Sequence, residues 1–294
     1  MKILIAGQNG IIGSFLYNEL KEKHEIIGIG KGKFDSSNYF DVDLSDENIV
    51  KDFVKSSEKF DVLIFLVGLA HDKGKNQDYP VFEKVNFITL LNLLEALKKE
   101  NKVPDRIIFS STISVYGEKI DKDVYKEEDE LSPNSPYAKT KILAEQYLKN
   151  NFKKKSWILR FSPVYSDKFN LNIKRRTLIK GKHYKVGDGA KKLSLLNIKN
   201  ISFVMKVIIN NNIPAGTYNL ADNMAYSYNE LLAHSNAKKI ITMPRIIPRI
   251  AYYVGRITNN IFLQENSIKL LTDNIYSTER LKKFIKLPYT LSSE

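Results

Sequence analysis

A glycine-rich turn close to the start of the chain is the feature that most restricts its fold. The turn, Gly7-Gln8-Asn9-Gly10-Ile11-Ile12-Gly13, follows the apolar run 2–6 and opens an amphipathic stretch. Between a strand and a helix, such glycines allow a tight turn, let a pyrophosphate approach the backbone and let the helix pack on the sheet. The helix N-terminus adds free amides and a positive dipole end. This turn therefore predicts dinucleotide contacts at Gly7, Asn9, Gly10, Ile12 and Gly13.

Short apolar runs alternate with amphipathic stretches through the first half of the chain. They predict strands at 2–6, 25–29, 62–67, 106–110 and 157–161, and helices at 13–22, 46–56, 81–100 and 136–152. This alternation is typical of α/β proteins with a doubly wound parallel sheet, so we expect a Rossmann-type fold. The pattern loosens after about residue 166. We therefore expect an NAD(P)-binding Rossmann domain over 1–166 and a smaller C-terminal substrate lobe over 167–294, partly interleaved with the first.

Composition narrows the class of protein. The 294 residues carry a net charge of +13 and no cysteine, which excludes disulfides and thiolate metal sites and is typical of a cytoplasmic protein. No signal peptide is recognisable, and the longest apolar run, Val62 to Ala70, is too short to span a membrane. The positive charge fits a solvated surface, attraction of a phosphate-bearing substrate, or contact with an anionic membrane. No nucleic-acid-binding motif accompanies it, so no nucleic-acid partner is expected.

Tyr137 and Lys141 predict a site for proton transfer. They are four residues apart on the predicted helix, so the phenol and the ammonium share one face. A tyrosine ordinarily keeps its proton until about pH 10, but a cation nearby favours the phenolate and lowers the pKa. Upstream, Ser110, Thr112 and Ser114 lie at the end of a predicted strand, where their hydroxyls either bond a substrate oxygen or cap a local turn.

The end of the second predicted strand bears on the choice of dinucleotide. An acid commonly binds the adenosine 2′-hydroxyl there, but the stretch Gly28-Ile29-Gly30-Lys31-Gly32-Lys33 contains none. Lys31 would accept a 2′-phosphate, so NADP is expected at least as readily as NAD. Asp43 and Leu44 follow and would suit the adenine, although Asp43 could equally cap the next helix.

Two other features leave alternatives open. The four histidines, His24, His71, His183 and His234, lack the spacing of metal ligands, so no metal is expected. His71 follows the strand predicted at 62–67, at the sheet edge where it could contact substrate, and is first interpreted as a surface histidine. The apolar, basic and aromatic segment 244–262 is first expected to pack in the core or in a dimer, and alternatively to lie on a membrane surface.

Together these residues resemble the extended short-chain dehydrogenase/reductase superfamily, in its branch of NAD-dependent sugar-nucleotide epimerases and reductases. The resemblance runs through Gly7, Gly10 and Gly13, Asp43-Leu44, Val67-Gly68, Asn86, Ser111-Thr112, Tyr137 and Lys141, and 159–165. It implies that Thr112 and Tyr137 flank the sugar C4 hydroxyl or ketone. It also implies that Lys141 holds the nicotinamide ribose and that Pro163 lies by the carboxamide.

The resemblance also implies further contacts. The expected cofactor contacts beyond the glycine turn are Lys31, Asp43, Leu44, Val67, Gly68, Asn86, Ser110, Tyr137, Lys141 and Pro163. The expected substrate contacts are Thr112, Ser114, Tyr137, Asn170 and Lys192, and the expected catalytic residues are Tyr137, Lys141 and Thr112.

Three activities are compatible with those residues. The first is a 4-epimerase that transiently oxidises a hexose carried on a nucleotide or lipid diphosphate. The second is an NADPH-dependent 4-ketoreductase, and the third is a cofactor-binding relative without catalysis. A dehydratase is disfavoured because Ile113-Ser114 stand where those relatives carry an acid pair. A homodimer is common in the branch that the chain resembles.

Overall fold

A seven-stranded sheet organises the first of two compact units. The computed structural model describes residues 1–70 and 78–292, and His71 lies outside them. Unit 1 comprises Met1–Val115, Ser135–Arg160 and Met205–Tyr218; unit 2 comprises Tyr116–Asn134, Phe161–Val204 and Asn219–Glu294. Both units therefore draw on both halves of the chain, and the division into domains at residue 166 stays a prediction.

The strand order of the sheet is β13-β7-β5-β4-β1-β2-β3, and every pair from β5 to β3 is parallel. This order confirms the Rossmann-type fold, because the direction of winding reverses between β1 and β4, where such sheets bind ligands. The strands are β1 (Lys2–Ala6), β2 (Glu25–Gly30), β3 (Tyr39–Asp41), β4 (Val62–Phe65), β5 (Arg106–Thr112), β7 (Ser156–Phe161) and β13 (Gly216–Leu220).

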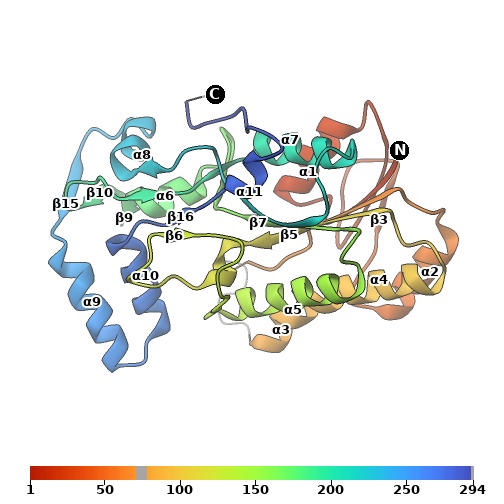
Figure 1. Ribbon diagram of the computed structural model, residues 1–294, viewed down its shortest axis with the longest axis horizontal. Helices are drawn as coiled ribbons and strands as arrows, with labels where there is room; N and C mark the ends of the chain where they lie inside the picture. The colour runs from red at the N-terminus through yellow and green to blue at the C-terminus, as the bar shows by residue number, and fades with distance from the viewer. Residues whose placement is uncertain (71–77, 293–294) are drawn as a thin grey trace. The chain divides into compact units, whose positions relative to one another are not determined.

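Helices lie on both sides of this sheet, with α1 on one side and α4 and α5 on the other (Figure 1). They are α1 (Ile11–Leu20), α2 (Glu47–Ser56), α3 (Tyr79–Glu83), α4 (Thr89–Lys99) and α5 (Pro136–Asn151). The core between sheet and helices contains Leu4, Phe65, Leu94, Phe109 and Leu148, all fully buried. The strand β4 reads Val-Leu-Ile-Phe and is buried throughout, as expected for a strand covered on both faces.

Local sequence explains where these helices begin. Asp46 caps α2 by accepting from the backbone N–H groups of Asn48 and Ile49. Ser135 caps α5 in the same way, and Pro136 occupies its first turn. The helix predicted over 81–100 is interrupted, because a π-helical turn, η1 (Lys84–Ile88), separates α3 from α4. The strand β3 was not predicted.

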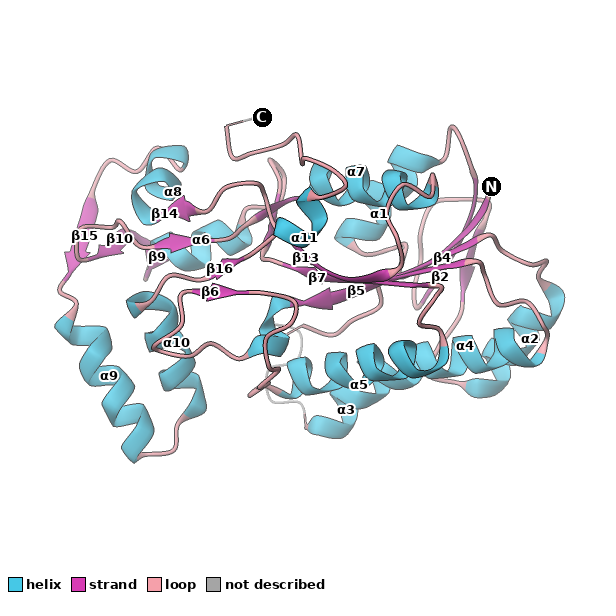
Figure 2. Cartoon of the chain, viewed as in Figure 1, coloured by secondary structure: helices cyan, strands magenta, loops and turns pink. Residues whose placement is uncertain are grey.

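Unit 2 consists of short strands and helices, shown by type in Figure 2. A second core gathers Tyr165, Ile173, Leu195, Tyr226 and Leu231. The elements are β6 (Val124–Tyr125), β8 (Val164–Tyr165), α6 (Leu171–Thr177), β9 (Leu178–Ile179), β10 (Lys182–Val186), β11 (Lys192–Leu193), β12 (Leu196–Asn197), β14 (Tyr226–Ser227), α8 (Tyr228–His234), β15 (Ile240–Met243), α9 (Ile246–Ile257), α10 (Ile261–Leu271), β16 (Ile275–Tyr276) and α11 (Glu279–Lys282). Helix α7 (Ile198–Ile209) begins in unit 2 and ends in unit 1.

Candidate active site

The glycine turn has the geometry of a phosphate cradle. Gly7 has φ +86°, which is strained for any other residue. A Cβ on Gly13 would lie 2.2 Å from the Gly7 carbonyl oxygen, so only glycine lets α1 start so close to the turn. The N-cap of α1, Gly10, provides no side-chain cap, and no acid occupies the first turn, which contains Ile12. The first amides of α1 therefore face outward with a positive dipole end and no side-chain acceptor.

The surroundings of Lys31 at the end of β2 differ from those expected from the sequence. The Lys31 ammonium donates to Asp43 Oδ2 at 2.9 Å, so Lys31 is not an isolated cation. Ser45 and then Lys31 lower the pKa of Asp43 to about 2. In addition, β3 pairs with β2 so that Asp41 stands opposite Gly30, and Asp41 Oδ1 accepts from the N–H of Gly32 at 3.0 Å. The carboxylate that the stretch 28–33 lacks is thus supplied by the neighbouring strand.

Sequence reasoning missed Asp41 because it missed β3. The only signal was the short aromatic run Tyr39-Phe40 before it. Leu44 is 4% exposed and packs in the core, which leaves only its main chain available to a ligand. Asn9 links the glycine turn to the end of β2, because its Nδ2 donates to the Lys31 carbonyl oxygen at 2.8 Å.

The predicted hydroxyl and amine residues come together at the carboxyl end of β5. Thr112 is the last residue of β5, and its hydroxyl bonds both the Tyr137 phenol and Ser114 Oγ, the latter at 3.3 Å. Lys141 lies one turn after Tyr137 in α5. Its ammonium donates to the Ser110 carbonyl oxygen at 2.9 Å and to the Val67 carbonyl oxygen at 3.3 Å. A hydroxyl, a phenol and an amine therefore share one site in unit 1.

The residues after β4 complete this site. A Cβ on Gly68 would lie 3.3 Å from Lys141 Nζ, so glycine lets the backbone pass close to the amine. Asn86, in the π-helical turn, is fully buried; its Oδ1 accepts from the Leu69 N–H at 2.6 Å and its Nδ2 donates to Thr140 Oγ1 at 3.1 Å. The interruption of the predicted helix thus directs Asn86 to hold the segment that follows β4.

Burial shifts the pKa values of both Tyr137 and Lys141, and the shift of Tyr137 is opposite to the one expected from the sequence. Burial raises the pKa of Tyr137 to about 12, and the hydrogen bond from Thr112 opposes this only in part. Burial also lowers the pKa of Lys141 to about 7, although the Glu145 carboxylate favours its charge. The expectation that the Tyr137 pKa lies below its usual value is therefore wrong for these residues by themselves, because burial raises it and the opposing hydrogen bond from Thr112 does not compensate.

A buried ion pair supports the site, and sequence reasoning did not find it. Glu145 Oε1 accepts from Arg160 Nε at 3.0 Å and from Ser111 Oγ at 2.6 Å, while Oε2 accepts from Arg160 Nη2 at 2.7 Å. The side chains are 0% and 1% exposed. Burial acts to raise the Glu145 pKa, but Arg160 leads a set of partners that lower it. The available signals were an arginine inside a buried strand and an acid one turn after Lys141.

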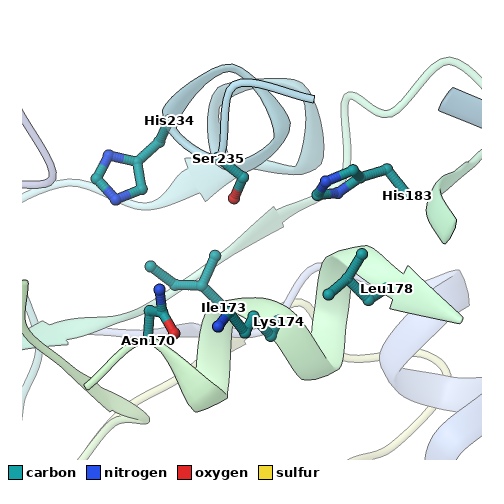
Figure 3. A pocket seen from close by; sticks show the side chains of 7 residues that line it. All are labelled: Asn170, Ile173, Lys174, Leu178, His183, His234 and Ser235. Atoms are coloured by element: carbon teal, nitrogen blue, oxygen red, sulfur yellow. The ribbon is translucent and has the colours of Figure 1, made fainter. Parts of the chain in front are cut away.

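Three predicted contacts, Pro163, Asn170 and Lys192, belong to unit 2. The Pro163 carbonyl accepts from the Leu196 N–H at 3.1 Å. Lys192 lies exposed in β11, with its N–H donating to Asp273 Oδ1 at 2.9 Å. Asn170 starts α6 and lines a cavity of about 210 Å³. The cavity lies between α6 and the segments that carry His183, His234 and Ser235 (Figure 3).

The residues of unit 1 fit a dinucleotide. The turn has no room for side chains at Gly7 and Gly13, the first turn of α1 has no side-chain cap, and a polar cluster lies at the same sheet edge. Within 1–70 and 78–292, no group of three His, Cys, Asp or Glu residues is arranged to hold a metal ion. Over the same residues, no helix is both long and apolar enough to cross a bilayer.

Comparison with known proteins agrees with this fit. The sequence pattern of the NAD dependent epimerase/dehydratase family matches residues 3–221, and the chain belongs to that family. This membership confirms the resemblance predicted from the sequence and, at the level of the family, a nicotinamide dinucleotide as cofactor.

Individual relatives match over part of their length. The chain is 33% identical over 202 residues to an uncharacterized UDP-glucose epimerase, YtcB, of Bacillus subtilis (strain 168), which covers 61% of this chain and 62% of that protein. It is 28% identical over 166 residues to a UDP-glucose 4-epimerase of Yersinia enterocolitica, which covers 51% of this chain and 48% of that protein. The chain thus spans less than two thirds of these curated relatives.

Solved structures match over nearly the whole chain. The UDP-Glc/GlcNAc 4-epimerase of Campylobacter jejuni superposes with a TM-score of 0.75 at 20% identity, covering 98% of this chain and 94% of that one. The UDP-glucuronic acid 4-epimerase of Bacillus cereus, in complex with NAD, has a TM-score of 0.72 at 20% identity, covering 100% and 94%. At these identities the likeness establishes the fold.

Proposed function

We propose that the protein is a sugar-nucleotide 4-epimerase that uses a nicotinamide dinucleotide. The observation that carries the proposal is the cluster of Thr112, Tyr137 and Lys141 at the carboxyl end of β5, in a chain of the epimerase/dehydratase family. A curated relative named UDP-glucose 4-epimerase supports carbon 4 as the reacting centre and a nucleotide diphosphate as the carrier.

The residues fall into three groups along the proposed dinucleotide. Gly7, Asn9, Gly10, Ile12 and Gly13 would hold the pyrophosphate through backbone amides and the end of α1. Asp43, Leu44 and Lys31 would contact the adenosine. The nicotinamide half would be held by Val67, Gly68, Asn86, Ser110, Tyr137, Lys141 and Pro163. When bound there, the dinucleotide would supply the redox chemistry of the proposed reaction, as the acceptor and donor of hydride for the sugar carbon.

Tyr137 is the proposed base for the sugar hydroxyl. It would take the hydroxyl proton as the carbon is oxidised and return it on reduction, with Thr112 orienting that proton. Tyr137 can ionise near neutrality only if added positive charge brings its pKa down from about 12. Lys141 is the amine placed to contribute once it is charged, and its bonds to Ser110 and Val67 fix its position. Ser114, Asn170 and Lys192 are the remaining proposed substrate contacts.

The end of β2 favours NAD over NADP. Lys31 is already paired with Asp43, and Asp41 bonds the adjacent N–H of Gly32. Two carboxylates at this edge would repel a 2′-phosphate, whereas they suit a ribose hydroxyl. The proposal for this chain is therefore a recycled NAD, which an epimerase needs and a ketoreductase does not.

One assay tests the activity and the cofactor together. The purified protein is incubated with UDP-glucose or UDP-N-acetylglucosamine without added nicotinamide, and the products are separated by chromatography. Interconversion of the C4 epimers supports the proposal, as does release of NAD from the denatured protein. A protein that leaves these sugars unchanged but reduces a 4-keto sugar with NADPH is a ketoreductase, and the epimerase proposal fails.

A further inference from the structure

Helix α9 exposes an unusually apolar face. Large side chains that are 45–83% exposed recur at helical spacing, namely Ile246, Ile247, Ile250, Tyr253, Val254 and Ile257. At 3.6 residues per turn they fall within an arc of about 120°. The opposite face, with Pro248 and Gly255, is buried. The expectation that segment 244–262 packs in the core therefore holds only for that second face.

Helix α10 covers the buried face of α9 and leaves the apolar face of α9 exposed. A Cβ on Gly255 would lie 3.0 Å from both the backbone N and the Cγ of Gln264, so the two helices pack backbone to backbone at this point. Gln264 also donates from Nε2 to the Gly255 carbonyl oxygen at 2.9 Å. Figure 1 shows α9 lying beside α10. The apolar arc turns away from this contact.

Two arginines flank the apolar face on one side. Arg249 and Arg256 are seven residues apart, both exposed, and neither forms an ion pair with any residue in the described part of the chain. Arg245, just before the helix, is by contrast paired with Asp188 at 3.1 Å. An apolar strip beside guanidinium groups without acidic partners is the composition of a helix that lies on an anionic lipid surface.

We propose that the apolar face of α9, with Arg249 and Arg256, docks on an anionic phospholipid bilayer. The helix would lie in the plane of the interface, because 12 residues reach only about 18 Å, against about 30 Å of hydrocarbon. The six apolar side chains enter the headgroup boundary while the arginines meet lipid phosphates. The net charge of +13 attracts the protein to the same surface. The proposed epimerase activity is not needed for this inference.

Area and charge favour lipid over a second copy of the chain. A strip about 18 Å long and about 10 Å wide offers on the order of 200 Å², whereas a stable dimer buries about 800 Å² per partner. Two copies packed through α9 would also bring four arginines towards one another without acids on the helix to balance them. Docking on a bilayer requires neither a contact of that area nor acidic side chains on a second helix.

Vesicle flotation tests the proposal. The full-length protein is expected to float with vesicles of phosphatidylcholine and phosphatidylglycerol, and less with phosphatidylcholine alone. Arg249→Gln with Arg256→Gln should weaken binding about 25-fold, at about fivefold for each arginine, and added salt should do the same. Ile250→Gln with Ile257→Gln should abolish flotation, because it removes the centre of the apolar strip.

Matched control variants distinguish binding through α9 from binding through positive charge or apolar side chains elsewhere on the surface. Lys153→Gln with Lys154→Gln removes two exposed positive charges elsewhere, and Ile49→Gln removes an isoleucine on α2 that is 43% exposed. Both variants should float like the wild type. Because every substituted side chain is exposed, thermal unfolding should match the wild type for all of them, which excludes misfolding as the cause.

Several results would overturn the proposal. They are wild-type protein that stays unbound, control variants that lose binding as much as the α9 variants, and α9 variants that float as well as the wild type. Sedimentation of the wild type and the isoleucine variant, which measures their oligomeric state, gives a further result that would overturn the proposal. A wild-type dimer that the two isoleucine substitutions convert to monomer, without vesicle binding, would assign this face to a second copy.

Discussion

Replacing Lys141 by methionine is expected to stabilise the protein at pH 7 while removing its proposed activity. The lysine side chain is 2% exposed, and its pKa falls from 10.5 to about 7 because burial disfavours the charge. The unfolded chain therefore binds more protons than the folded one between pH 7 and 10.5, and stability rises with pH across that window. Below pH 7 the full penalty of the buried charge is present.

The magnitude follows from those two pKa values. At pH 7 the difference corresponds to about 4 kcal/mol against the folded state. Methionine removes that penalty but loses the hydrogen bonds to the Ser110 and Val67 carbonyls, at about 1 kcal/mol each. The variant should therefore be more stable by about 2 kcal/mol at pH 7. At pH 9.5 most of that penalty is gone and the remainder no longer exceeds the two lost hydrogen bonds, so the advantage should vanish or reverse.

Urea unfolding of wild type and Lys141→Met at the two pH values measures this difference. Lys139→Met, on the exposed side of the same helix, is the matched control and should change stability by less than about 0.5 kcal/mol at either pH. A difference between Lys141→Met and wild type that does not depend on pH would refute the argument, because a buried amine must titrate with folding. Turnover by Lys141→Met at the wild-type rate would remove Lys141 from the proposed site.

Three further predictions concern the site and its support. Tyr137→Phe should lower turnover by about 10²–10⁴-fold with dinucleotide binding retained, and turnover within a few-fold of wild type would contradict the proposed base. Arg160→Leu leaves the buried Glu145 carboxylate without its two-point partner and should cost about 3–5 kcal/mol in urea unfolding. Adding Glu145→Leu should recover part of that loss, and a double variant as unstable as the sum of the single ones would contradict the coupling. Gly13→Ala places a Cβ 2.2 Å from the Gly7 carbonyl, so fluorescence titration should detect little NAD binding, and unchanged affinity would contradict the cradle.

Local sequence was enough to predict the main elements of unit 1. The strand at 2–6 matches β1 residue for residue, and α2 and α5 begin within one residue of the starts predicted at 46 and 136. Hydrophobic period, caps and glycine turns act over a few residues, so they can be recognised without knowing the partners. The alternation of strands and helices likewise predicted the class of the sheet, a doubly wound parallel one.

Features that depend on distant partners were not predictable in this way. Strand β3 is three residues long and is defined by its pairing with β2, so Asp41 became visible only in the fold. The π-helical turn at Asn86 satisfies the Leu69 backbone across a gap of 17 residues. The cavity beside Asn170 likewise depends on α8 and β10, which come later in the chain.

The sequence by itself determined the family, the Rossmann-type sheet and the residue types that meet at Thr112, Tyr137 and Lys141. Only the tertiary structure decided the direction of the pKa shifts of Tyr137 and Lys141, because burial is a property of the packed molecule and it disfavours the charged form of both side chains. It also decided that α9 leaves its apolar arc uncovered, since an amphipathic pattern is the same whether its face meets a core or remains exposed.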